Sequence, residues 1–96
     1  MPLQIHTNAI QVLRNMKNPS FVIFELKNNL LVDFAESENE AFDKCKIAEK
    51  YGSGCKYYET SVTTIDDIRE ATKDIDVTNP MQGVKIEGID MGFFES

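Results

Sequence analysis

Residues 21–35 have the sequence FVIFELKNNLLVDFA and predict a β-hairpin at the centre of the fold. Two apolar runs, 21–27 and 30–35, are separated by Asn28-Asn29. Asparagine tolerates positive φ, so these two residues allow a type I′ turn. The expected hairpin therefore pairs Lys27 with Leu30.

In this register both faces of the hairpin are largely apolar. Alternation along the strands places one set of side chains together: Phe21, Ile23, Leu30, Val32 and Phe34. The other face carries a second set: Val22, Phe24, Leu26, Leu31 and Ala35. A hairpin that is apolar on both sides must be covered on both sides, by helices or by a second subunit.

Three segments around the hairpin have helical patterns. Residues 7–17 carry one apolar stripe, with Thr7 or Asn8 as the cap. A second helix, 38–51, follows the capping box that starts at Ser37, and Gly52 stops it. A third helix, 65–75, is capped by Thr63 or Thr64 and turns an apolar side inward: Ile65, Ile68, Thr72 and Ile75.

Residues 55–63 and 84–91 predict two further strands, the second with a bulge or close contact at Gly88. Helices and strands then follow one another in the order α-β-β-α-β-α-β. We expect one small α+β domain that spans residues 1–96. Its mixed or antiparallel four-stranded sheet would have the helices packed on it.

The chain is acidic, with a formal net charge of −6, and the imbalance lies in one part. Residues 57–96 hold nine acidic and three basic residues, whereas residues 1–56 hold seven of each. This charge argues against direct binding of nucleic acid and against anionic membranes, which both attract Lys and Arg. Neither a signal peptide nor an apolar run of about 18 residues is visible, so we expect a cytoplasmic protein and no membrane contact.

No catalytic, cofactor or metal site is expected. The single histidine, His6, lies at the start of the first helix, and nothing in the sequence places Cys45 or Cys55 beside it. One histidine and two cysteines nine residues apart do not provide the four ligands of a structural zinc site. Asp33 falls among apolar hairpin residues, where a lysine partner, a helix cap or an edge position would explain it.

The most informative feature is the outer side of the third helix. Four carboxylates share that side: Asp66, Asp67, Glu70 and Asp74. Asp66, Glu70 and Asp74 follow each other at four-residue spacing, which is about 6 Å along a helix axis. This side is either a recognition face for a basic partner or an ordinary solvated surface.

We therefore expect a small non-enzymatic binding protein, of the inhibitor or adaptor type, that covers the basic surface of a protein partner. Asp66, Asp67, Glu70 and Asp74 would steer that partner, and a nucleic-acid-binding protein recognised by acidic mimicry is one version. A structural or assembly subunit that acts as a homodimer is an alternative. A small enzyme is another, although the sequence offers no identifiable catalytic pair for it.

Overall fold

The computed structural model describes residues 2–80 and 83–90. The chain forms three helices and five strands within these residues, so the predicted α+β class is confirmed. Their order is β1(Pro2–Ile5), α1(Thr7–Asn15), β2(Phe21–Glu25), β3(Leu30–Ala35), α2(Glu38–Lys50), β4(Cys55–Glu59), α3(Val62–Thr72) and β5(Val84–Asp90). The order matches the prediction except for β1, which the sequence analysis did not identify.

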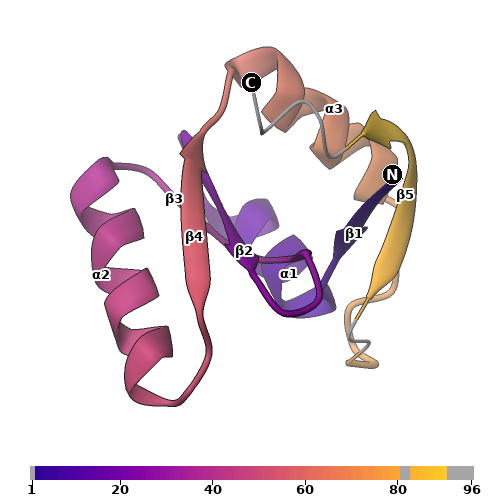
Figure 1. Ribbon diagram of the computed structural model, residues 1–96. Helices are drawn as coiled ribbons and strands as arrows, with labels where there is room; N and C mark the ends of the chain where they lie inside the picture. Colours follow the sequence, from indigo (N-terminus) through magenta and orange to yellow (C-terminus); the bar gives the residue numbers. More distant parts are fainter. Residues whose placement is uncertain (1, 81–82, 91–96) are drawn as a thin grey trace.

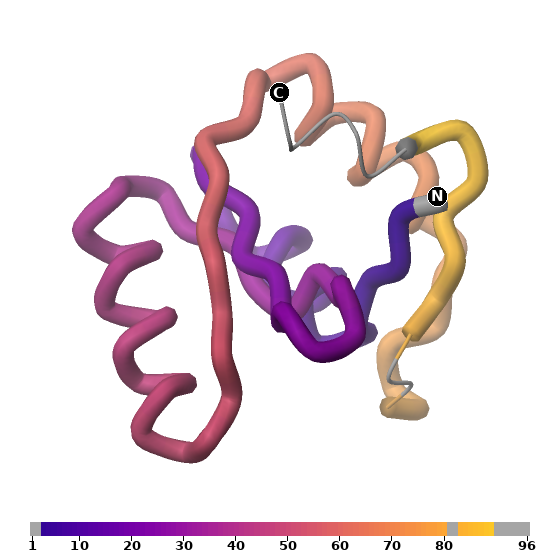
Figure 2. The backbone as a smooth tube through the Cα atoms, in the orientation of Figure 1, coloured from indigo at the N-terminus to yellow at the C-terminus, as the bar shows by residue number. Residues whose placement is uncertain are grey.

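The five strands form one mixed sheet in the order β4-β2-β3-β1-β5. β1 runs parallel to β3, while the β1–β5, β2–β3 and β2–β4 pairs are antiparallel. Figure 2 shows the indigo N-terminal strand between the hairpin and the yellow C-terminal strand. The additional strand therefore joins the predicted hairpin to β5, and without it the sheet would be split.

The hairpin forms, but its predicted pairing is wrong. Glu25, and not Lys27, pairs with Leu30, and residues 26–29 form a four-residue turn with Asn29 at a φ of 49°. Asparagine adopts this left-handed conformation at low cost. Asn29 therefore provides the predicted positive φ, although the turn is longer than predicted. Leu26 lies in that turn and is exposed, instead of lying on a strand face.

A β-bulge in β3 changes which side chains share a face. Ile23 pairs with Asp33 and Phe24 with Leu31, so Val32 is the extra residue on its strand. Leu31 and Phe34 consequently lie on the same side of the sheet, although simple alternation placed them on opposite sides. Asp33 is turned toward the other side.

Helices cover the two sides of the sheet unequally (Figure 1). On one side, α1 and α3 pack on a large cluster that contains Leu3, Ile10, Phe34 and Ile68, all of them fully buried. On the other side, α2 packs on a small cluster of four buried residues: Phe21, Ile23, Ala35 and Ala41. The hairpin is thus covered on both sides by helices of its own chain, which is one of the two predicted arrangements.

Helix ends are set by local capping groups. α1 begins after His6, whose Nδ1 accepts a hydrogen bond from the Asn8 backbone N–H at 3.0 Å, so neither Thr7 nor Asn8 is the cap. Ser37 caps α2 by accepting from the Glu40 N–H, as the capping box predicts. The first helix ends at Asn15, two residues before the predicted end.

β4 and β5 form the two edges of the sheet. β4 ends at Glu59, four residues before the predicted end, because α3 begins earlier than expected. In β5, Leu3 pairs with Ile86 and Pro2 with Asp90, so the strand bulges around Gly88, which has a φ of 84°. This confirms the predicted bulge, whereas residue 91 of the predicted strand lies outside the described residues.

Candidate interaction surface

α3 begins three residues before its predicted start. Ser61 caps it by accepting a hydrogen bond from the Thr64 N–H at 3.2 Å, so the predicted caps Thr63 and Thr64 lie inside the first turn. Ile65, Ile68 and Thr72 are buried against the sheet, as predicted. These buried residues fix the rotation of α3, and hence the direction of its outer side.

The four predicted acidic residues are all exposed: Asp66, Asp67, Glu70 and Asp74. We call these four residues the acidic face. The first three lie on α3, but the helix ends at Thr72, so the predicted extension to residue 75 is wrong and Asp74 lies in the following turn. The third carboxylate of the four-residue series therefore sits just beyond the helix and not on it.

Both arginines near this helix are occupied by backbone carbonyls. Arg69 donates from Nη1 to the Leu13 carbonyl at 3.0 Å and from Nη2 to the Met16 carbonyl at 2.9 Å. Arg14 donates from α1 to the carbonyls of Thr72 at 2.9 Å and Ile75 at 2.8 Å. Each arginine thus caps the C-terminal end of the other helix, where unpaired carbonyls favour a cation.

One lysine compensates one carboxylate of the acidic face. Lys73 Nζ lies 2.6 Å from Glu70 Oε1, and this hydrogen bond raises the pKa of Lys73. Among residues 2–80 and 83–90, no ion pair joins Asp66, Asp67 or Asp74 to a basic side chain. The acidic face therefore keeps most of its negative charge.

One neighbouring residue, Val62, adjoins the acidic face and was missed in the sequence. Val62 is 74% exposed and lies one helical turn before Asp66, so an apolar side chain adjoins the carboxylates. It was assigned to the preceding strand, and Ser61-Val-Thr-Thr is the capping signal that could have corrected this. Asp76 is exposed as well, and hydrogen bonds from the Thr78 hydroxyl and N–H lower its pKa.

The structure does not bring histidine and cysteine together. His6 lines a polar cavity of about 420 Å³ with Glu25, Lys27 and Ser53. Cys45 and Cys55 instead line a groove of about 550 Å³ between α2 and β4. Burial raises the pKa of both thiols, and nearby acidic groups raise it further, which disfavours the nucleophilic thiolate.

The remaining sequence candidates have structural partners. Asp33 is half-buried, and its Oδ1 lies 3.1 Å from the ammonium of Lys44, which also donates to the Phe34 carbonyl. The backbone N–H groups of Gly52 and Ser53 donate to carbonyls at the end of α2, so this loop terminates a helix. Across the residues that the structure describes, no group of three or more His, Cys, Asp and Glu side chains could hold a metal ion.

The described residues contain no helix that is long and apolar enough to cross a membrane. Comparison with known proteins finds no match to this chain, whether among protein-family models, curated proteins or solved structures.

Proposed function

We propose that this chain is a small non-enzymatic binding protein that docks its acidic face on the basic surface of a protein partner. The observation that carries the proposal is that the guanidinium groups of Arg14 and Arg69 are hydrogen-bonded to backbone carbonyls and not to the carboxylates of the acidic face. Arg69 lies on α3 and Arg14 on the neighbouring α1, yet their guanidinium groups donate to carbonyls at the C-terminal ends of α1 and α3. The charge that could have neutralised the acidic face is thereby directed away from it.

The acidic face is also rigidly supported, which favours recognition over simple solvation. The inward side of α3 is buried through Ile65, Ile68 and Thr72, and Arg69 joins the helix to α1 by hydrogen bonds. Carboxylates held at fixed spacing need little reordering when a cationic partner arrives. Their field accelerates encounter, and exposed Val62 supplies an apolar contact once the surfaces meet.

Acidic mimicry is the narrower version of the proposal. Asp66 and Glu70 are one helical turn apart, about 6 Å along the axis, which resembles the spacing of phosphates on a nucleic-acid strand. A protein that binds nucleic acid through Lys and Arg would then accept this face in place of phosphates. In this version the partner is a nucleic-acid-binding protein, and the chain acts as its inhibitor or adaptor.

The test uses a fluorescently labelled oligolysine peptide as the cationic probe. The variant neutralises the whole acidic face: Asp66→Asn, Asp67→Asn, Glu70→Gln and Asp74→Asn. Stopped-flow measurements should show the association rate at low salt falling about tenfold relative to the unmodified chain. The difference should disappear at high salt, because screening removes steering.

A matched control removes the same number of exposed charges elsewhere: Glu38→Gln, Asp43→Asn, Glu49→Gln and Glu87→Gln. Its association rate should stay close to that of the unmodified chain. Amide shifts during an NMR titration should change mainly along α3. If both sets of substitutions slow association equally, only net charge matters and the proposal is wrong.

A further inference from the structure

One edge of the sheet, as formed by the described residues, is regular and carries no further strand. β4 pairs with β2 through five consecutive residues without a register shift, and no described strand lies on its other side. β5, at the opposite edge, is interrupted by the bulge around Gly88. Bulges protect sheet edges against pairing with another chain, so β4 is the edge that remains able to accept a strand.

The hydrogen-bond pattern shows which backbone groups β4 leaves unused. The Thr60 N–H donates to the Ser20 carbonyl and the Leu26 N–H to the Gly54 carbonyl. By the alternation of an antiparallel ladder, Lys56 and Tyr58 then point their backbone groups toward β2. The N–H and carbonyl groups of Cys55, Tyr57 and Glu59 consequently point away from the sheet.

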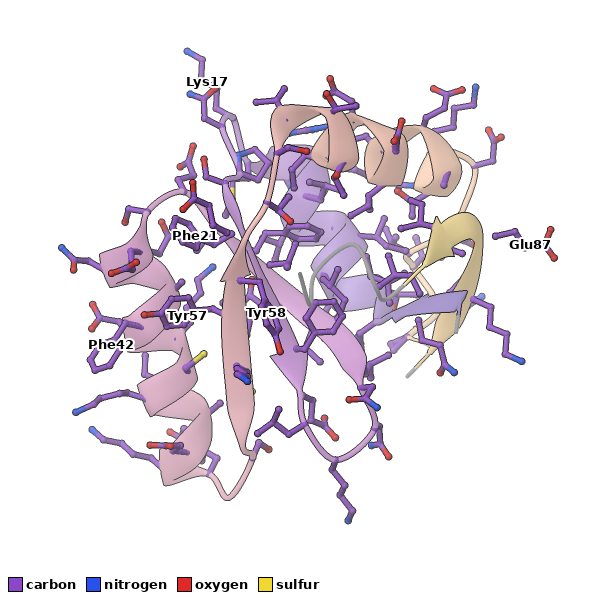
Figure 3. The ribbon with its side chains drawn as sticks, turned by 45° about the horizontal axis from the view of Figure 1, so that its top comes forward. Lys17, Phe21, Phe42, Tyr57, Tyr58 and Glu87 are labelled. Atoms are coloured by element: carbon purple, nitrogen blue, oxygen red, sulfur yellow. The ribbon has the colours of Figure 1, made fainter. Side chains whose placement is uncertain are left out.

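The side chains along this edge are also arranged for a partner. Tyr57 packs on Phe21 and faces α2, whereas Tyr58 packs on Phe24 on the other side of the sheet (Figure 3). Phe42 of α2 is 47% exposed and lines the groove beside β4 together with Tyr57. An apolar ring therefore stands next to the unused backbone groups.

We propose that a second copy of this chain pairs with β4, strand to strand and antiparallel, about a two-fold axis at Tyr57. In this register Tyr57 faces Tyr57 of the second copy and Cys55 faces Glu59. All three outward residues of each strand then form hydrogen-bonded pairs. The five-stranded sheets of the two copies become one continuous sheet.

Charge favours this register over its neighbour. With the axis at Tyr57, Lys56 lies opposite Tyr58 of the second copy, and its ammonium already lies 5.6 Å from the Tyr58 ring within one chain. Moving the axis to Lys56 would place two lysines directly opposite each other and would leave fewer backbone pairs. The register centred on Tyr57 pairs the outward residues Cys55, Tyr57 and Glu59 of both strands and opposes no like charges, and this self-complementarity favours a second copy as the partner.

The first experiment combines sedimentation equilibrium with amide hydrogen exchange at low and high protein concentration. The mass should rise from 10.9 kDa toward twice that value as concentration increases from micromolar to millimolar. The exchange rate of the Tyr57 N–H should fall as the fraction of dimeric chains rises, because only the monomer exposes this group. The Tyr58 N–H should be protected at both concentrations. A chain that stays monomeric, or a dimer that leaves Tyr57 exchange unchanged, overturns the proposal.

The second experiment tests the register by cross-linking. In a Cys45→Ser background, Glu59→Cys places a thiol opposite Cys55 of the second copy, and oxidised glutathione should convert the two thiols into an intermolecular disulfide. Within one chain, positions 55 and 59 are about 13 Å apart along the strand and cannot be bridged. Glu87→Cys in the same background is the exposed control, and equal dimer yields from both variants contradict the proposed register.

Discussion

At the scale of single residues, the two cysteines show what a sequence position cannot reveal. Cys45 lies within the predicted helix 38–51 and Cys55 at the start of the predicted strand 55–63. In the structure α2 and β4 lie side by side, so both thiols are half-buried in one groove. Their shared surroundings come from the tertiary arrangement, which residue spacing did not indicate.

Both thiols have a raised pKa in the folded protein, mainly because burial disfavours the thiolate. Their contribution to stability is therefore fully present below the pKa of the unfolded thiol and is lost as pH rises through the folded value. We expect the free energy of unfolding to fall, as pH rises above about 8.5, more steeply in the unmodified chain than in Cys45→Ser/Cys55→Ser. Urea titrations across this range measure it, and parallel pH profiles for the two proteins would contradict the expectation.

At the scale of elements, long patterns were predictable and short or irregular ones were not. α2 begins where its capping box predicts, and the inward residues Ile65 and Ile68 of α3 are correct. β1 has four residues, too few to establish alternation, and its position is set by pairing with distant strands. The bulge at Val32 depends on the packing of both sheet faces, so a uniform register assigned Phe34 to the wrong side.

The candidate surface likewise combines local features, which the sequence predicts, with long-range contacts, which it does not. Asp66, Asp67 and Glu70 could be placed outward from their helical spacing, because Ile65 and Ile68 define the opposite side, whereas Asp74 lies beyond the helix end. The engagement of Arg14 and Arg69 could not be predicted, since it joins residues more than fifty positions apart. It requires the C-terminal ends of α1 and α3 to meet.

Arg69 should stabilise this junction measurably. Its half-buried guanidinium donates to two carbonyls at the end of α1, and Arg69→Met leaves both without that partner. Because hydrogen bonds to charged groups contribute about 1.5–3 kcal/mol, we expect a loss of about that size in the free energy of unfolding. Lys73→Met, which removes an exposed cation at the C-cap of the same helix, is the control and should change stability little. Urea unfolding measures the free energy of unfolding of both variants. Equal losses would show that the hydrogen bonds of Arg69 to the two carbonyls do not stabilise the junction.

At the scale of the whole molecule, the sheet separates two cores of very different size. Among residues 2–80 and 83–90, the core formed with α1 and α3 contains thirteen buried residues, whereas the core formed with α2 contains four. Ala41 is the buried residue of α2, and Phe42, Ile47 and Tyr51 are exposed. Less apolar area therefore holds α2 than holds the other helices, and we infer that α2 is the least stable part of the described structure.

This inequality predicts that α2 opens without global unfolding. In native-state hydrogen exchange, the amides of Cys45 to Lys50 should exchange with a lower free energy and a weaker denaturant dependence than those of α1, because their opening exposes less surface. Ala41→Gly should accelerate exchange in α2 alone, since it weakens a helix that already opens by itself. Ala71→Gly, the same substitution at an exposed position of α3, should instead lower the stability of the main core by about 1 kcal/mol and shift all core amides together. Identical exchange free energies in α1 and α2 would mean that the two cores unfold as one unit.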